Sequence, residues 1–424
     1  MNLSSPTPRQ QRGAAALLVT VLLFFTLLLA TVFANRNLVF EQRTSANQVR
    51  STQAFEAAEA GLEWALARLN DHQRIGADCL PSTSAASSFR ERYLSYQRVS
   101  STFVAVPWSN GGVLTPLQPS CVRTTSGWAC SCPTQGPSGL AATPGNGFFP
   151  AFTVQFVATV KPGIVRVIST GCTSLAGACV PGAGSSTDAT ARVEVAVGLL
   201  PGLATPPVAP LTARGEVNTS APIGVHNTDV AVGAIAVHSG ATISAASARV
   251  TGPAGSSPAG ALVGQDAGLA NLSPGQFFSA YFGLDKASWK NQPAVKQVGC
   301  NGNCAPALQG AIGTDVVNPL IWVSGDLILD GPVTLGSPQR PVVIVADGAA
   351  RLNGAVTVHG VIYSAAMSWN NTAAPGALLR GAAIVEGGYQ GGGAPDLYYD
   401  RELLATLSGN TGSFARVNGS WRDF

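Results

Sequence analysis

Residues 14–34 read AAALLVTVLLFFTLLLATVFA, and no charged side chain interrupts them. At 1.5 Å per residue, a helix of this length spans roughly 31 Å, which is the thickness of a bilayer core. Arg9 and Arg12 precede the apolar run, so the positive-inside rule places the first residues in the cytoplasm and the rest of the chain outside it. The stretch therefore predicts a membrane-spanning helix close to the N-terminus.

A secretory signal peptide is the alternative interpretation of this stretch. Its apolar region would be shorter, at about 7–15 residues, and a cleavage site with small residues would follow it. Here a helical pattern continues instead, because apolar side chains recur every three or four residues at Phe55, Ala58, Leu62, Ala65 and Leu69. We predict one nearly continuous helix from about Ala14 to Leu69, roughly 84 Å long, whose second half packs on a domain.

Two short motifs on this helix give the chain a family resemblance. Gln11-Arg12-Gly13, directly before the apolar run, resembles a type IV prepilin leader, and AFEAAEAGL at residues 54–62 resembles a segment of the PilX-like minor pilins. The resemblance implies that a prepilin peptidase cuts after Gly13 and that Ala14 becomes the N-methylated first residue. It implies Leu18, Phe55, Glu59 and Leu62 as helix-packing residues.

The resemblance also implies partners and a location. The partners would be other minor pilins and the major pilin, the inner-membrane assembly machinery, the prepilin peptidase and a tip adhesin. The chain would be bacterial, held in the inner membrane by a single N-terminal span with its bulk in the periplasm, and would then enter an extracellular pilus.

Leu18 departs from the usual pilin pattern. It is the fifth residue counted from Ala14, where most pilins have a glutamate that is thought to pair with the amino terminus of a neighbouring subunit. A buried carboxylate without a partner is costly, and a subunit at the filament tip has no neighbour ahead of it to supply the amine. Leucine here suits a tip subunit, although a membrane anchor unrelated to pilins would carry it as well.

The expected fold is mostly β with a long N-terminal helix. Residues 71–200 predict an α+β or β-rich head, since runs at residues 152–157, 164–169 and 191–197 alternate at period two and are bounded by Gly, Pro or Ser. The resemblance implies that this head is pilin-like. Antiparallel pairing of these strands against the second half of the helix would bury its apolar stripe. Four prolines between Pro201 and Pro210 predict a semi-rigid linker at 201–211.

Residues 212–424 predict a parallel β-solenoid. Residues 321–336 align with 344–359 at a shift of 23 residues, with matching Ile, Gly, Leu, Val and Thr positions. Short strands with glycine corners at such a period are typical of stacked turns, although a β-sandwich of hairpins remains the alternative. The expected segments are thus a leader at 1–13, a helix at 14–70, a head at 71–200, a linker at 201–211 and the solenoid at 212–424. The C-terminal stretch 414–424 resembles the end of long PilX-like proteins, and its Trp421 and Phe424 predict a tied-down terminus.

The chain has eight cysteines, an even number behind a membrane-targeting start, which predicts disulfides in an oxidising compartment. They are Cys79, Cys121, Cys130, Cys132, Cys172, Cys179, Cys300 and Cys304. We expect Cys121, Cys130, Cys132, Cys172 and Cys179 to lie in loops of the head, and Cys300 and Cys304 to close a tight loop. Zinc at Cys130 and Cys132 is the alternative, but one residue separates them and no His lies nearby. No metal or cofactor is expected.

We find no catalytic constellation in the sequence. Asp326, Asp330 and Asp347 fall at expected solenoid corners, where carboxylates could serve glycoside hydrolysis or bind calcium, but solvated turn residues are the favoured interpretation. Each of the four histidines is isolated in sequence from Cys and carboxylate clusters. His226 and His238 are 12 residues apart and could face each other across a turn, but surface or rung positions are the favoured interpretation. Charged residues are only 11% of the chain and the net charge of +3 forms no basic stripe, so a nucleic-acid partner is not expected.

Three functions compete. The first is a structural subunit, a minor pilin that enters or initiates a type IV pilus or a secretion pseudopilus, at or near its tip. The second is an adhesin or binding module that the filament displays. The third is a membrane-anchored enzyme acting on polysaccharide, which would need carboxylates converging in a cleft.

Overall fold

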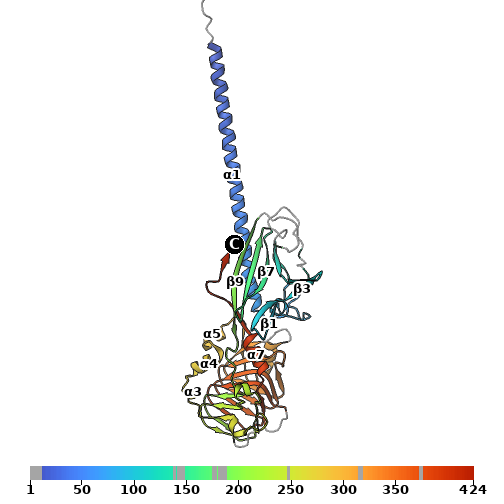
Figure 1. Ribbon diagram of the computed structural model, residues 1–424, viewed down its shortest axis with the longest axis vertical. Coiled ribbons are helices and arrows are strands. Elements are labelled where there is room, and N and C mark those ends of the chain that lie inside the picture. The colour runs from blue at the N-terminus through green and yellow to red at the C-terminus, as the bar shows by residue number, and fades with distance from the viewer. Residues whose placement is uncertain are drawn as a thin grey trace, which may run out of the picture.

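The computed structural model describes residues 12–136, 140, 149–173, 179, 189–245, 249–313, 319–371 and 376–424. One long helix, α1 (Arg12–Leu69), stands clear of the rest of the molecule for about half its length and then packs on a β-rich head (Figure 1). A second β domain lies at the end of the head opposite the free part of α1. The predicted long helix is therefore confirmed.

The head is built on an antiparallel sheet behind α1. Its strand order is β28-β9-β8-β7-β5-β6, and β29 also pairs with β9. The three strands predicted from alternation are β7 (Ala151–Ala158), β8 (Ile164–Cys172) and β9 (Thr190–Pro201), and all three contact α1. The remaining elements of the head are β5 (Ser120–Thr124), β6 (Gly127–Ser131), α2 (Phe89–Tyr93), β1 (Leu94–Gln97), β2 (Thr102–Ala105), β3 (Pro107–Asn110) and β4 (Val113–Pro116).

The end of the chain returns to the head, which corrects the expected extent of the C-terminal domain to residue 424. Strand β28 (Gly412–Arg416) pairs antiparallel with the last residues of β9, and β29 (Arg422–Asp423) pairs with its middle. Phe414 is 1% exposed and belongs to the core of the head. Burial of this aromatic ring and the strand pairing hold the C-terminal segment in place, whereas Trp421 and Phe424, from which a tied-down end was predicted, are themselves 42% and 71% exposed.

The eight cysteines form four disulfides: Cys79–Cys132, Cys121–Cys130, Cys172–Cys179 and Cys300–Cys304. The first three are in the head and the fourth is at the start of α6 (Ala305–Ile312). The expectation that the head cysteines lie in loops was wrong for three of them. Cys121, Cys130 and Cys172 lie in strands β5, β6 and β8, where Cys121 and Cys130 face each other across a hairpin.

The second domain is a stack of parallel β turns with three faces. The first face runs β17-β18-β21-β23-β25-β10-β13-β16, the second runs β19-β22-β24-β26-β11-β14, and the third runs β20-β23-β25-β27-β12-β15. The strands are β10 (Leu211–Ala213), β11 (Val217–Thr219), β12 (Gly224–His226), β13 (Val237–Ser239), β14 (Ile243–Ser244), β15 (Arg249–Thr251), β16 (Leu262–Val263), β17 (Val295–Gly299), β18 (Leu320–Ser324), β19 (Leu327–Asp330), β20 (Val333–Leu335), β21 (Val342–Ala346), β22 (Ala350–Asn353), β23 (Val356–Ser364), β24 (Met367–Asn370), β25 (Leu378–Val385), β26 (Tyr389–Gly391) and β27 (Asp396–Tyr398).

The 23-residue repeat of the sequence appears as strand register. Ile321 pairs with Ile344, Leu329 with Leu352 and Val333 with Val356, each in parallel. Hairpins of a sandwich would pair antiparallel, and the described strands of this domain pair only in parallel. Strands β23 and β25 each belong to two faces and turn the corner at Gly360 and Gly381, which pair with each other and have φ of 151° and 130°.

The order of the turns in this stack differs from their order in the sequence. Strand β10, the first in sequence, pairs with the late strand β25, and β10–β16 continue the stack away from the head. Helices α3 (Ala267–Ala270), α4 (Pro274–Phe282) and α5 (Lys286–Lys290) then run back along the side of the stack to β17 (Figure 1). Together with α7 (Arg401–Gly409) they cover the outside of the first face, so β21 is buried on both sides.

The proline-rich segment between the two domains is packed rather than exposed. Leu203 is fully buried in the cluster under α4 and α5, and the indole Nε1–H of Trp289 donates to the carbonyl of Gly202 at 3.0 Å. The expected linker at 201–211 therefore gives way to a segment that joins the head to the parallel domain through core contacts. Its prolines fix the backbone while Leu203, Ala209 and Leu211 are buried.

Candidate functional site

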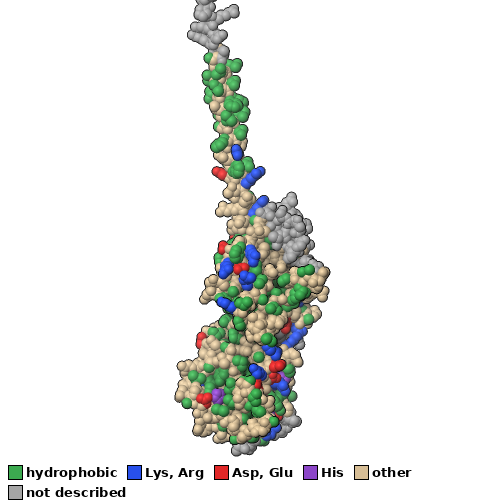
Figure 2. Space-filling model, viewed as in Figure 1, with side chains coloured by type: hydrophobic (Ala, Val, Ile, Leu, Met, Phe, Trp, Pro, Cys, Tyr) green, Lys and Arg blue, Asp and Glu red, His purple; other side chains and the backbone are tan. Residues whose placement is uncertain are grey.

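The free half of α1 exposes a continuous apolar surface. Its large side chains from Leu17 to Phe40 are about half to two-thirds exposed, and Leu18 is 61% exposed (Figure 2). Helix α1 is long and apolar enough to cross a membrane, with a mean hydropathy of 2.7 over its most apolar window. Gly13 lies in the first turn of the helix with no atom close to it, and Ala14 follows it, although its side chain is outside the described residues.

The packed half of α1 explains the AFEAAEAGL motif. Ala54, Ala58 and Leu62 are buried at 0–2% exposure, so small side chains bring the helix close to the sheet. Gly171 of β8 lies directly against the α1 backbone, because a Cβ there would overlap the carbonyl oxygen of Ala54 and the amide of Ala58. Gly61 of α1 similarly lies against Phe152 and Ser169. The motif thus serves close approach of a helix to a sheet.

The other predicted packing residues divide between core and solvent. Phe55 is half-buried against the head core and meets the ring of Trp421 edge-on, with centroids 6.3 Å apart. Glu59 is exposed, so the prediction that it packs is wrong for contacts within this chain. A carboxylate next to buried alanines stays in water because its desolvation would be costly.

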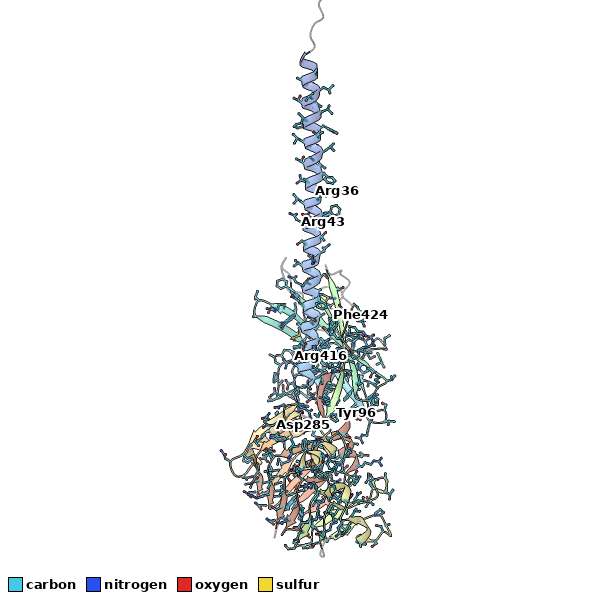
Figure 3. All side chains as sticks on the ribbon, turned by 90° about the vertical axis from the view of Figure 1, so that its left-hand side faces the viewer. Arg36, Arg43, Tyr96, Asp285, Arg416 and Phe424 are labelled. Atoms are coloured by element: carbon cyan, nitrogen blue, oxygen red, sulfur yellow. A yellow bond between two sulfur atoms is a disulfide. The ribbon has the colours of Figure 1, made fainter. Side chains whose placement is uncertain are left out.

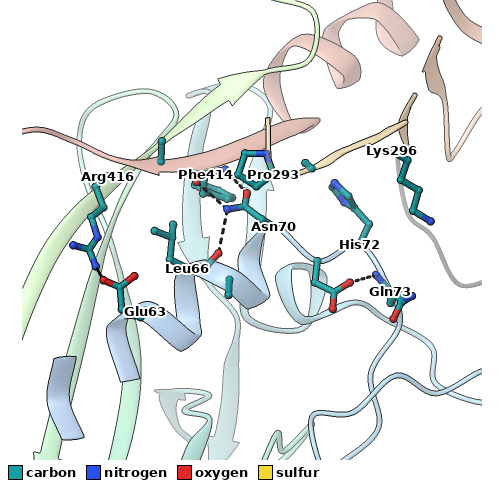
Figure 4. Close-up of a pocket in the computed structure, with 13 residues that line it drawn as sticks. Glu63, Leu66, Asn70, His72, Gln73, Pro293, Lys296, Phe414 and Arg416 are labelled. Carbon is teal, nitrogen blue, oxygen red and sulfur yellow. Dashed lines mark hydrogen bonds and ion pairs between the residues drawn. The ribbon is translucent and has the colours of Figure 1, made fainter. Parts of the chain in front are cut away.

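Asn70, just after the end of α1, joins the helix to the C-terminal strand (Figure 4). Its side-chain amide donates to the carbonyls of Phe414 and Leu66 at 3.0 and 3.1 Å, and its carbonyl oxygen accepts from the amide of Phe414 at 2.7 Å. The side chain therefore mimics a neighbouring strand at the edge of β28. Sequence patterns gave no sign of this role, because the partner is 344 positions away.

The role of two buried arginines of α2, Arg90 and Arg92, could not be predicted from the sequence either. Arg90 donates to the carbonyls of Gly412 and Asn410 at 3.1 and 2.5 Å, and burial lowers its pKa to about 9. Arg92 donates to the carbonyls of Ile75, Gly76 and Cys132 at 2.5–2.9 Å. The guanidinium group of Arg92 thus fixes the loop around the Cys79–Cys132 disulfide, whereas that of Arg90 holds the start of β28 against α2.

A cavity of about 790 Å³ lies where α1, β28 and the parallel domain meet (Figure 4). It is lined by Glu63, Leu66, Ala67, Asn70, Asp71, His72, Gln73, Pro293, Ala294, Lys296, Phe414, Ala415 and Arg416. His72 is 8% exposed, and its Nε2 atom is buried without a hydrogen-bond partner among the described residues. Burial, with Arg90 and Lys296 nearby, lowers the pKa of His72 to about 3.

His72 should make the folded state sensitive to acid. Between pH 6.5 and 3 the unfolded chain binds a proton that folded His72 does not, so the free energy of unfolding falls as the pH drops through that window. The loss is at most roughly 3–5 kcal/mol. We expect His72→Gln to flatten this dependence when unfolding is measured from pH 7 to 3. An unchanged slope in the variant would show that His72 is not the source of the acid sensitivity.

The candidate catalytic groups do not converge. Asp326 accepts from the amide of Ala349 at 2.9 Å and pairs with Arg351, whereas Asp330 accepts from the side-chain amide of Asn353 at 2.7 Å. His226 and His238 each hydrogen-bond an aspartate distant in sequence, Asp396 at 3.0 Å and Asp266 at 2.6 Å. Within the described ranges no three His, Cys, Asp or Glu side chains group as metal ligands do. The aspartates at the corners hold neighbouring turns together.

Comparison with known proteins agrees with the N-terminal geometry. The family model described as PilX N-terminal matches residues 12–63. No curated protein matches the chain. Among solved structures, the competence-associated pilin ComZ from Thermus thermophilus shares 14% identity over 88% of this chain and 97% of that chain, with a TM-score of 0.21. That score is too low for the likeness to carry any argument.

The fold and its exposed apolar helix fit a membrane-anchored subunit whose head packs on the second half of the same helix. The family match narrows the kind further: residues 12–63 are similar to the N-terminal segment of PilX-like type IV pilins. This similarity supports a type IV pilin-like structural subunit, a kind of protein that associates with other pilins.

Proposed function

We propose that the chain is a minor pilin that enters a type IV pilus or a related pseudopilus at or near its tip. Leu18 is the main support for a tip position. Its exposed apolar side chain replaces the glutamate of most pilins, which is thought to pair with the amine of a neighbouring subunit. The prepilin peptidase, the inner-membrane assembly machinery, other minor pilins and the major pilin are the proposed partners. The chain would be held in the inner membrane with its bulk in the periplasm, before it enters the extracellular filament.

Maturation at Gly13 tests this proposal. Gly13→Leu should leave the precursor uncut in the inner membrane, since the peptidase subsite would have to accept a branched side chain in place of hydrogen. N-terminal sequencing should find N-methyl-Ala14 in the parent chain and Met1 in the variant. Gly310→Leu, at a helical position with equally open surroundings, is the control and should mature normally. An intact Met1 in the parent chain would refute the proposal.

Leu18→Glu tests the tip position. At a tip, the new carboxylate has apolar neighbours and no amine, and a central acidic residue costs roughly 2.5–3.5 kcal/mol in a membrane helix. We expect fewer pili and less anchored subunit, with the leader still cleaved. Counting pili and the subunit that co-purifies with them gives the answer, because a gain of subunit along the shaft would place the chain inside the filament instead.

Display of a binding surface is a second candidate function. The parallel domain lies at the end of the molecule opposite the membrane helix, where a filament tip would present it (Figure 1). Its distal turns are nearly uncharged, since Arg249 is the one Lys, Arg, Asp or Glu between Val230 and Gln265. Bacteria that lack this protein, but whose number of pili has been restored by other means, should then fail to attach.

A further inference from the structure

A groove runs between the packed half of α1 and the returning C-terminal segment. It has a volume of about 320 Å³ and is lined by Glu56, Glu59, Ala60, Leu62, Glu63, Arg416 and Trp421. Arg416 pairs with Glu63 at one side. Glu56 and Glu59 are exposed and form no ion pair within the part of the chain that the structure describes. The groove therefore offers two uncompensated carboxylates.

The wall of the groove is aromatic. Trp421 is 42% exposed and is held by its edge-on contact with Phe55. A cation placed over an indole face is attracted by the ring, and a guanidinium also binds carboxylates through paired N–H donors. Carboxylates beside an indole thus suit an arginine side chain.

The same chain carries arginines with the required spacing. Arg36 and Arg43 project from the free part of α1, are exposed, and have no acidic partner among the described residues (Figure 3). They are seven residues apart, as are Glu56 and Glu63, and positions seven apart lie within about 20° of each other on a helix. At about 100° per residue, Glu41, Glu56, Glu59 and Glu63 lie roughly 140–200° around the helix from Arg36, so the two charges occupy opposite sides of α1.

We propose that this groove receives Arg36 and Arg43 of a second copy of the chain, which rests on the proposed role as a filament subunit. Shifting one parallel α1 by 20 residues, about 30 Å, brings Arg36 opposite Glu56 and Arg43 opposite Glu63, beside Glu59. The contact joins different surfaces of the two copies, so the copy that supplies the arginines lies ahead, where it can occupy the tip, and its own groove stays open. Charge reversal on either side removes it.

Reciprocal charge reversal tests the contact in cells. One variant carries Arg36→Glu and Arg43→Glu, and the other carries Glu56→Arg and Glu59→Arg, which leaves the Glu63–Arg416 pair intact. Each alone should reduce the chain in sheared filaments about tenfold relative to the membrane pool, and expressing both together should restore it to within twofold. Glu41→Arg is the matched control: it lies on the acidic side, but the 20-residue shift places it opposite Val21, so it should have no effect.

Several results would overturn the proposal. An unaffected Glu56→Arg/Glu59→Arg chain would mean that the groove is empty. A loss in the Arg36→Glu/Arg43→Glu chain that co-expression does not repair would assign these arginines to anionic lipid headgroups. A loss in Glu41→Arg would indicate a shift of five residues instead of 20.

A second measurement separates this proposal from the proposed function. Arg36→Lys and Arg43→Lys keep the charge and supply amines, which a zero-length carbodiimide joins to adjacent carboxylates with loss of water. Treated envelopes should yield dimers in which residue 36 or 43 is joined to Glu56, Glu59 or Glu63, as mass spectrometry identifies. Absence of the parent chain from filaments refutes the filament role, whereas absence of these cross-links refutes the groove contact.

Discussion

Gly171→Val is expected to detach α1 from the head and unfold the antiparallel sheet. The new Cβ would overlap the backbone of Ala54 and Ala58, and because these are backbone atoms no side-chain rotation can relieve the clash, so α1 must move away from the sheet. Forced separation also exposes Ala54, Ala58 and Leu62, which are buried at 0–2%. A clash with backbone combined with lost burial belongs to the severe class, at more than about 4 kcal/mol. Urea unfolding of the full chain in detergent, followed by intrinsic fluorescence, measures the loss.

Gly198→Val provides the control for that experiment. Gly198 is also a strand glycine of the same sheet, but a Cβ there would make only an ordinary contact with Val417 at 3.6 Å. Its effect should stay below about 1 kcal/mol. Equal losses in the two variants would show that strand propensity, not close approach of α1, determines the cost.

Gly360→Val should disrupt the parallel domain to a similar degree. Gly360 has φ 151°, and a Cβ there would overlap the carbonyl oxygen of Val342 in the next turn. Because β23 passes from one face to another at this residue, the strain and the overlap act on both faces. We expect a loss of more than about 3 kcal/mol, read as a lower thermal transition and rapid proteolysis within residues 211–398.

Gly331→Asn separates conformational strain from the overlap. Gly331 has φ 79° with no atom within 4 Å of a Cβ, and asparagine adopts this conformation more readily than other residues. A loss of about 1 kcal/mol or less is expected. Comparable proteolysis of the two variants would contradict the role assigned to the corner at Gly360.

Periodic patterns of apolar residues predicted the elements whose structure depends on residues close in sequence. The span of α1, the strands β7–β9 and the 23-residue repeat could all be inferred, because each leaves a regular pattern of apolar side chains in its own stretch. Pairing of β28 with β9, or of β10 with β25, leaves no such pattern, since the partners are about 170–210 residues apart. The prediction of a linker at 201–211 was wrong for the same reason, because burial of this segment under α4 and α5 depends on residues distant in sequence.

In the candidate site, too, features set by nearby residues could be predicted, and features set by distant partners could not. The AFEAAEAGL motif indicated packing of α1, and the structure adds the reason, which is the partner glycine at 171. Glu59 of that motif was predicted to pack, yet it lines a groove whose other wall, Trp421, comes from the end of the chain. Asn70 and Arg90 act on carbonyls of residues 410–414, so neither their burial nor their partners could be read from their neighbours in sequence.

The parallel domain is inserted between β9 and β28, and both connections leave the sheet at the same end, where Pro201 pairs with Gly412. When something pulls on that domain, the tension enters the head through two adjacent strands together. It runs along the strands and therefore perpendicular to their hydrogen bonds, and β9 is bonded to β8 from Thr190 to Gly198. All these bonds would share such a load in shear instead of opening one after another, so a pull on the parallel domain reaches α1 through two strands that resist it together.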